Sequence, residues 1–285
     1  MRFRILCVGD VVGKPGCRVL SQGLPALKEE HELDCVIANV ENAAGGSGLT
    51  ENLHGKIRRY GVDVMTMGDH VYRRAEIIPV LERSSCILRP ANLPPEAPGK
   101  TMVVHETKEG QRVAVITLMG RLFMKPAVDC PYRTVDRLLE SLDDEIKMIV
   151  VEMHAEATSE KISMGWHLDG RVSLVFGTHT HVTTADERVL PRGTGYITDL
   201  GMTGPHDGVL GRNKDRVLKS FIAATPTPFS VAEGDLRLHG IVATLDAGTG
   251  RCLHIERVAY TLDEAVPGPD ADAARDSVIA SGEHG

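Results

Sequence analysis

Short apolar runs alternate with helix-forming segments in the N-terminal third of this chain, and that order constrains the fold more than any other feature. The apolar runs predict strands at 3–9, 34–40 and 62–68. Helical spacing of the apolar residues predicts helices at 17–31, 50–61 and 75–84. This strand–helix order is typical of a mainly parallel sheet that is covered by helices.

The pattern changes beyond residue 100, where antiparallel pairs join the parallel strands. A helix is predicted at 133–142, with strands at 147–154 and 171–177. Paired apolar runs around short turns predict hairpins at 101–120, 185–201 and 239–260. This mixture indicates two packed sheets flanked by helices, in a single domain over residues 1–262. The segment 263–285 is rich in Asp, Ala, Gly and Pro and lacks periodicity, so we expect it to be disordered.

Composition and charge restrict the class of protein. The chain has 285 residues, of which 42% are hydrophobic, which is enough for a substantial core. A formal net charge of −7 argues against a surface that wraps nucleic acid, so we expect no stable nucleic-acid complex. No apolar run approaches the roughly 20 residues that span a bilayer, and no membrane association is expected. Six dispersed cysteines without a CxxC pair indicate reduced thiols and a cytoplasmic location.

Polar residues follow the predicted strands at the points where the strands end. In chain order they are Asp10, Glu41, Asn42, Asp69, His70, His154, His179 and His181. The carboxyl ends of strands line the functional crevice of open α/β sheets, so these side chains are expected at one edge. Their mixture of carboxylate, amide and imidazole groups suits iron, manganese or zinc better than calcium.

Each of these residues also has a structural explanation. Asp10 could cap the helix that follows it, and "ENAAGG" could be turn chemistry. A lone histidine such as His154 is more often structural than a ligand. His179 and His181 are a stronger signal, because side chains two residues apart on an extended segment point the same way. The coincidence of so many polar residues at strand ends favours a metal site over separate caps and turns.

Five local motifs carry a resemblance to a known family. They are "VGDVVG", "NVENAAGGSGLT", "MGDHVYRR", "HAEATSEK" and "GTHTHV". Together they resemble the calcineurin-like metallophosphoesterases, and most closely the YmdB-like branch, which comprises bacterial proteins with phosphodiesterase activity on cyclic nucleotides. The match runs from about Arg4 to Tyr260. It implies an α/β fold, a four-layer α-β-β-α sandwich with two mixed β-sheets, and a two-metal site.

The resemblance also implies a role for each residue. The first metal would be held by Asp10, Asn42 and His181, the second by Asp69, His154 and His179, and Glu41 would bridge both. His70 would donate a proton to the leaving oxygen. The implied cofactors are two divalent or trivalent transition-metal ions, with iron expected and manganese or zinc as alternatives. Val12 and Glu41 agree with the YmdB-like branch, whereas Asp69 stands where the family usually has asparagine.

The function implied is hydrolysis of small cyclic nucleotides, both 2′,3′-cyclic and 3′,5′-cyclic, by attack of a metal-bridging hydroxide. A broad-specificity phosphatase or nuclease is the first alternative, and a metal-containing regulatory binding protein the second. A homo-oligomer is expected. Further candidate substrate contacts are the loop 45–50, Arg121 and His206, and a position that only faces solvent is the plain alternative for Lys161.

Overall fold

Two mixed sheets form the centre of the protein, of which this computed structural model describes residues 1–262. The first sheet has eight strands, and β1, β3, β4 and β5 run parallel within it. Its order is β2 (Asp10–Val11), β12 (Met202–Pro205), β13 (Leu236–Asp246), β1 (Arg2–Val8), β3 (Cys35–Asn39), β4 (Val64–Thr66) and β5 (Ile87–Leu88), with β14 (Cys252–Thr261) paired antiparallel to β13.

The second sheet has six strands. Its order is β10 (Arg188–Val189), β11 (Gly195–Ile197), β9 (Leu174–Thr178), β8 (Met148–His154), β7 (Arg112–Met119) and β6 (Met102–Glu106). The four central strands are parallel, while β6 and β10 are antiparallel edge strands. Both sheets are therefore mixed, as the sequence predicted.

Side-chain alternation along the strands explains why the two sheets pack together. Phe3 and Ile5 of β1 belong to an apolar layer that also contains Phe176 of β9 in the other sheet. Leu6 and Val8 alternate with them and belong to the layer beneath the helices. Because successive residues of a strand point to opposite faces, an uninterrupted apolar strand is buried on both sides.

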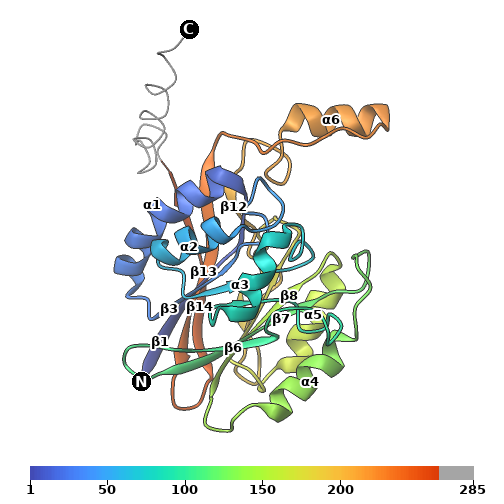
Figure 1. Cartoon of the computed structure of the whole chain (residues 1–285). Coiled ribbons are helices and arrows are strands. Elements are labelled where there is room, and N and C mark those ends of the chain that lie inside the picture. Colours follow the sequence, from blue (N-terminus) through green and yellow to red (C-terminus); the bar gives the residue numbers. More distant parts are fainter. Residues whose placement is uncertain (263–285) are drawn as a thin grey trace, which may run out of the picture.

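Helices cover the outer face of each sheet (Figure 1). The first sheet is covered by α1 (Gly13–His31), α2 (Glu51–Tyr60), the short 3₁₀ helix η1 (Ala75–Ile77) and α3 (Ile78–Arg83). The second is covered by α4 (Pro131–Ser141) and α5 (Thr158–Leu168), while α6 (Lys214–Ala223) projects from the body of the protein. The predicted four-layer α-β-β-α sandwich is confirmed.

Most predicted elements are present, with shifted ends. The hairpin partners β6–β7, β10–β11 and β13–β14 are antiparallel as expected. Helix α2 begins after Thr50, whose hydroxyl accepts from Leu53 N, and ends at Gly61 with φ 103°. Helix α1 starts at Gly13 rather than residue 17, and its N-cap is Val12. Asp10 lies in β2, so the helix-cap alternative for Asp10 is wrong.

Two further predictions concern the C-terminal segment and the number of domains. The segment 263–285, predicted to be disordered, lies outside the described residues, and the single-domain assignment of 1–262 stays a prediction. Within the described part of the chain, no helix is both long and apolar enough to cross a membrane.

Candidate metal centre

The carboxyl ends of strands from both sheets deliver the polar residues to one place. His154 is the last residue of β8, and His179 directly follows β9. Glu41 lies two residues beyond β3, and Asp69 three residues beyond β4. The parallel direction of these strands brings together side chains that are far apart in sequence.

Four of the side chains form a tight acidic and imidazole group. One ligand atom from each of Glu41, Asp69, His154 and His179 lies within 4.8 Å of the others. His154 Nε2 is 3.2 Å from Glu41 Oε1, 3.1 Å from Asp69 Oδ1 and 3.2 Å from His179 Nδ1. His179 Nδ1 is also 3.4 Å from Asp69 Oδ1. Four lone-pair-bearing atoms therefore converge on one point, as a metal site requires.

The two carboxylates of this group need a positive charge beside them. Burial lowers the pKa of His154, but the Glu41 carboxylate and a hydrogen bond to Asp69 outweigh burial and raise that pKa well above its usual value. Burial raises the pKa of Glu41 and Asp69, yet their interactions with His154 leave both pKa values below their ordinary range. Carboxylates that stay ionised in a buried site need a cation beside them.

A second group lies next to the first and contains Asp10, Asn42 and His181. Asp10 is fully buried, and its Oδ1 has no hydrogen-bond partner. Burial raises the pKa of Asp10 to about 8, against the opposing effect of His154. His181 Nε2 is 3.2 Å from Asn42 Nδ2 and 3.7 Å from Asp10 Oδ1. A buried carboxylate oxygen without a partner is the position that a bound cation would satisfy.

Polar contacts on the far side of each imidazole orient the other ring nitrogen toward the cluster. His179 Nε2 is 3.2 Å from the carboxylate of Glu156, and His181 Nδ1 donates to the Leu210 carbonyl at 3.1 Å. His154 Nδ1 is 2.8 Å from the Thr178 hydroxyl, which itself donates to Glu152. The outer nitrogen of each ring thus has a polar partner, and the inner nitrogen would offer its lone pair to a bound cation, which would replace the proton that the carboxylates favour on His154. Metal-binding histidines are oriented in this way, so the residues fit a metal centre.

His70 lies at the edge of the cluster, with 23% of its side chain exposed. Its Nδ1 donates to Asn42 Oδ1 at 2.8 Å, and its Nε2 is 3.6 Å from Asp69 Oδ2. Its backbone N–H donates to Glu41 Oε2 at 3.0 Å. His70 therefore touches the cluster but belongs to neither ligand group. Because Asn42 turns its amide oxygen to His70, rotation of that amide would be needed to present the oxygen to an ion.

A buried polar network beneath the cluster has no counterpart in the sequence prediction. Lys161 is 1% exposed, so the alternative that it only faces solvent is wrong. Its Nζ donates to Asp199 and to the hydroxyl of Thr180, the residue between His179 and His181. Both of these histidines have positive φ, 90° and 62°. Such backbone costs of order 1–3 kcal/mol per residue and persists only where its surroundings enforce it.

The less certain substrate contacts have different outcomes. In loop 45–50, the amides of Gly45 and Ser47 donate to the carbonyls of Ala43 and Ala44 just before the loop, which favours a plain connection over a phosphate cradle. Burial lowers the pKa of His206, whose ring lies tilted against that of His239, so a cationic contact with phosphate is disfavoured. The backbone N–H of Arg121 donates to Glu160 of α5, and the role of the exposed Arg121 side chain stays a prediction.

Comparisons with known proteins agree with this geometry. The family model described as YmdB-like protein matches residues 6–258. A Bacillus subtilis (strain 168) protein named 2′,3′-cyclic-nucleotide 2′-phosphodiesterase is 44% identical over 92% of this chain and 98% of its own length.

Two solved structures are similar along nearly the whole chain. One is a hypothetical protein from Thermus thermophilus, with a TM-score of 0.86 and 39% identity, covering 92% of this chain and 100% of that one. The other, titled a novel phosphatase, is from Mycoplasma pneumoniae, with a TM-score of 0.87 and 30% identity over 93% of this chain and 95% of that one. The expected calcineurin-like metallophosphoesterase fold is confirmed.

Proposed function

Since the chain belongs to the YmdB-like protein family and is a phosphoric diester hydrolase, we propose that its substrates are small cyclic nucleotides. The observation that supports the proposal is a group of four ligand atoms within 4.8 Å of one another, with further donor residues beside it. The four belong to Glu41, Asp69, His154 and His179, and the neighbours are Asp10, Asn42 and His181. The activity named for the B. subtilis relative supports the 2′,3′-cyclic class of substrate. Hydrolysis of 3′,5′-cyclic nucleotides is part of the same proposal.

We assign the ligands as two groups with one shared member. Asp69, His154 and His179 would hold one ion, Asp10, Asn42 and His181 the other, and Glu41 both. Glu41 Oε1 supports its shared position, because it is 3.2 Å from His154 Nε2 and 3.5 Å from Asn42 Nδ2. Two bound cations would offset the negative charge of the diester and make an attacking water more acidic. The nitrogen and oxygen donors suit iron, with manganese and zinc as alternatives.

The chain's own part in the chemistry is proton delivery and orientation. His70 is proposed as the donor to the leaving oxygen, because it lies at the rim of the cluster with 23% of its side chain exposed while its backbone N–H is held by Glu41 Oε2. Its Nε2 would carry the proton. A positioned general acid of this kind contributes about 10²–10⁴ in rate.

The test is a comparison of substrates on the metal-loaded protein. Turnover of 2′,3′-cyclic AMP, 3′,5′-cyclic AMP and bis-p-nitrophenyl phosphate should exceed that of p-nitrophenyl phosphate. A preference for the monoester would overturn the diesterase assignment in favour of a phosphatase, and absence of turnover with every metal would favour a binding protein. Elemental analysis of anaerobically purified protein identifies the metals.

The role of His70 has its own test. His70→Ala should retain both ions and lose about 10²–10⁴ of the rate. If the metal content falls by one equivalent instead, His70 is a ligand and the proposed roles are wrong.

We also propose that the protein is a cytoplasmic homo-oligomer. Phe221 and Ile222 of the projecting helix α6 are 74% and 85% exposed, which supports burial of this helix against another copy. None of the six cysteines forms a disulfide, which supports a reducing compartment. Light scattering on the native protein and on Phe221→Ser/Ile222→Ser tests the assembly, since the double variant should dissociate.

A further inference from the structure

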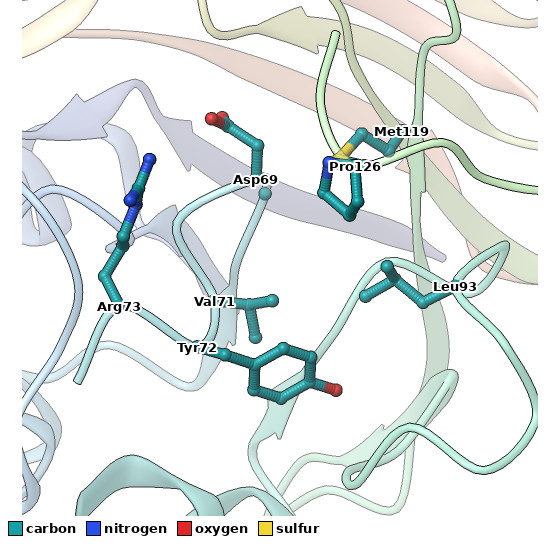
Figure 2. Close-up of a pocket in the computed structure, with 8 residues that line it drawn as sticks. Asp69, Val71, Tyr72, Arg73, Leu93, Met119 and Pro126 are labelled. Atoms are coloured by element: carbon teal, nitrogen blue, oxygen red, sulfur yellow. The ribbon is translucent and has the colours of Figure 1, made fainter. Parts of the chain in front are cut away.

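A pocket of about 250 Å³ opens beside the metal centre, and apart from Asp69 its lining residues belong to neither ligand group. Figure 2 shows Asp69 at one end, the ring of Tyr72 at the other, and Pro126, Met119 and Leu93 along one side. Asp69 is shared between this pocket and the metal cluster, where its Oδ1 is 3.1 Å from His154 Nε2. A group attached to a phosphate at the cluster would therefore lie within reach of the pocket.

The walls of this pocket are apolar and firmly packed. Leu93 and Met119 are 6% and 0% exposed, and Val71 is 2% exposed. The hydroxyl of Tyr72 donates to the Pro98 carbonyl at 2.6 Å, which fixes the ring and removes its polar atom from the pocket. What remains is a rigid slot with an aromatic ring. Flat heterocycles bind such slots by stacking and by burial of apolar surface.

The volume of the pocket is large enough for only one part of a nucleotide. Pockets for drug-sized ligands are roughly 300–1,000 Å³, so about 250 Å³ suits a single heterocycle and not a whole nucleotide. The anionic part of the substrate would then stay outside, at the metal centre. Exposed side chains of Arg73 and Pro126 place the mouth of the pocket at the protein surface.

We propose that this pocket is the nucleobase subsite of the enzyme and that Tyr72 is its stacking platform. The proposal rests on the proposed cyclic-nucleotide activity. The Arg73 guanidinium has no hydrogen-bond or carboxylate partner among residues 1–262, and it meets the sugar or phosphate at the mouth. Because the walls contain few polar atoms, shape and stacking select the base, and hydrogen bonds contribute little. Apolar pockets discriminate weakly between similar ligands, so 2′,3′-cyclic AMP and 2′,3′-cyclic GMP should differ less than about 100-fold in kcat/KM.

The test compares a nucleotide with a base-free ester that has the same reacting ring, glycerol 1,2-cyclic phosphate. Tyr72→Leu should raise KM for 2′,3′-cyclic AMP about tenfold, in line with loss of one stacked base, and leave kcat/KM for the glycerol ester within about twofold. Tyr72→Phe, which keeps the ring, should restore the native KM. Tyr132→Leu is the matched control, since the Tyr132 hydroxyl binds Ser163 on α5 and its ring does not line the pocket.

A second variant keeps the proposal testable if Tyr72→Leu does not fold. Leu93→Phe narrows the slot and should raise KM for the nucleotide without changing turnover of the glycerol ester. If either variant lowers kcat/KM by the same factor for both substrates, the nucleobase subsite is wrong, whereas the diesterase assignment stands. If the native protein hydrolyses glycerol 1,2-cyclic phosphate as well as it hydrolyses 2′,3′-cyclic AMP, the base is not bound. If the native protein hydrolyses neither ester, the proposed function fails and the subsite fails with it.

Discussion

Lys161 Nζ lies 2.5 Å from Asp199 Oδ2, and both side chains are about 1% exposed. The Asp199 carboxylate also accepts from the Thr180 hydroxyl at 2.6 Å and from Gly201 N at 2.7 Å. This ion pair therefore holds the peptide that carries two of the candidate metal ligands. It connects a helix on the outside of the second sheet to the centre of the site.

Removing one member of this pair should destabilise the protein strongly. Lys161→Met leaves the Asp199 charge buried without its cation, and an uncompensated buried charge costs about 3–5 kcal/mol. Unfolding in urea should show this loss, while Lys161→Met/Asp199→Asn should cost less than the two single variants combined. Additive single effects would contradict the pairing. Thr198→Val, which removes a buried hydroxyl bound to Asp186 instead, is the control.

The hydroxyl of Thr180 should matter for metal affinity more than for stability. It lies between two histidines with positive φ, and its bonds to Lys161 and Asp199 hold that strained peptide in place. Outer partners of metal ligands typically contribute 10–100-fold in affinity. We expect Thr180→Val to weaken manganese binding by at least tenfold in titration calorimetry and Thr180→Ser to restore it. If Thr180→Val binds manganese with the native affinity, the Thr180 hydroxyl is not needed to hold the two histidines at positive φ.

Much of the fold was predictable because its strands are continuous apolar runs. A strand buried on both faces leaves an unmistakable signal, as at Met148–His154. Helix α6 was missed although Val217, Leu218, Phe221 and Ile222 repeat at helical spacing. Within the described part of the chain Val217 is its only buried residue, so the helix contributes little to the core. The early start of α1 was missed as well. Its first residues include glycine and proline, which weaken a helical pattern, although proline is tolerated in the first turn.

The candidate site was predictable in part for a related reason. Its side chains come at the ends of predicted strands, so their positions can be identified from the sequence. The supporting residues have no such signal. Glu152 looks like one polar residue inside an apolar strand, and only the register with β9 brings it to Thr178. Lys161 resembles a solvent-exposed helical lysine, and its partner Asp199 is 38 residues away in sequence.

Gly68 should tolerate no side chain, because the backbone passes directly over a ligand. A Cβ at this position would lie 2.2 Å from His154 Nε2, and His154 is fully buried and cannot yield. Gly68→Ala should lose metal at the Asp69 group and at least 100-fold of the activity. Metal content per chain is the direct measurement. Gly55→Ala, in the open part of α2, should keep both properties and gain roughly 0.5–1 kcal/mol of stability.

Removal of metal should lower the thermal stability of the protein. The cluster holds three carboxylates in a small buried volume, and Asp10 Oδ1 has no partner without a cation. A ligand at 100 times its Kd stabilises the folded state by about 2.7 kcal/mol. At about 2–4 °C per kcal/mol, Tm should fall by about 5–10 °C on chelation and recover on addition of manganese. An unchanged Tm after complete chelation would argue against ions at this site.

The pH dependence of stability should contain a contribution from a histidine pair that belongs to neither ligand group. His206 and His239 have ring centroids 4.6 Å apart, beside Thr183, Asp235 and Arg237. Burial, reinforced by His206 and Arg237, lowers the pKa of His239 to about 4. The unfolded chain has a histidine pKa near 6.5, so the unfolded state binds the proton more readily.

The stability that His239 contributes is therefore complete above about pH 6.5 and is lost as the pH falls toward 4. At pH 5 the loss should be of order 1 kcal/mol, allowing for the partial exposure of the ring. In His239→Asn, which can still bond Thr183, the free energy of unfolding should change less with pH than in the native protein. Urea unfolding at pH 7, 6 and 5 measures this change. His254→Asn is the control, because that side chain is 64% exposed. If His239→Asn loses as much stability as the native protein over this interval, the acid sensitivity comes from other groups.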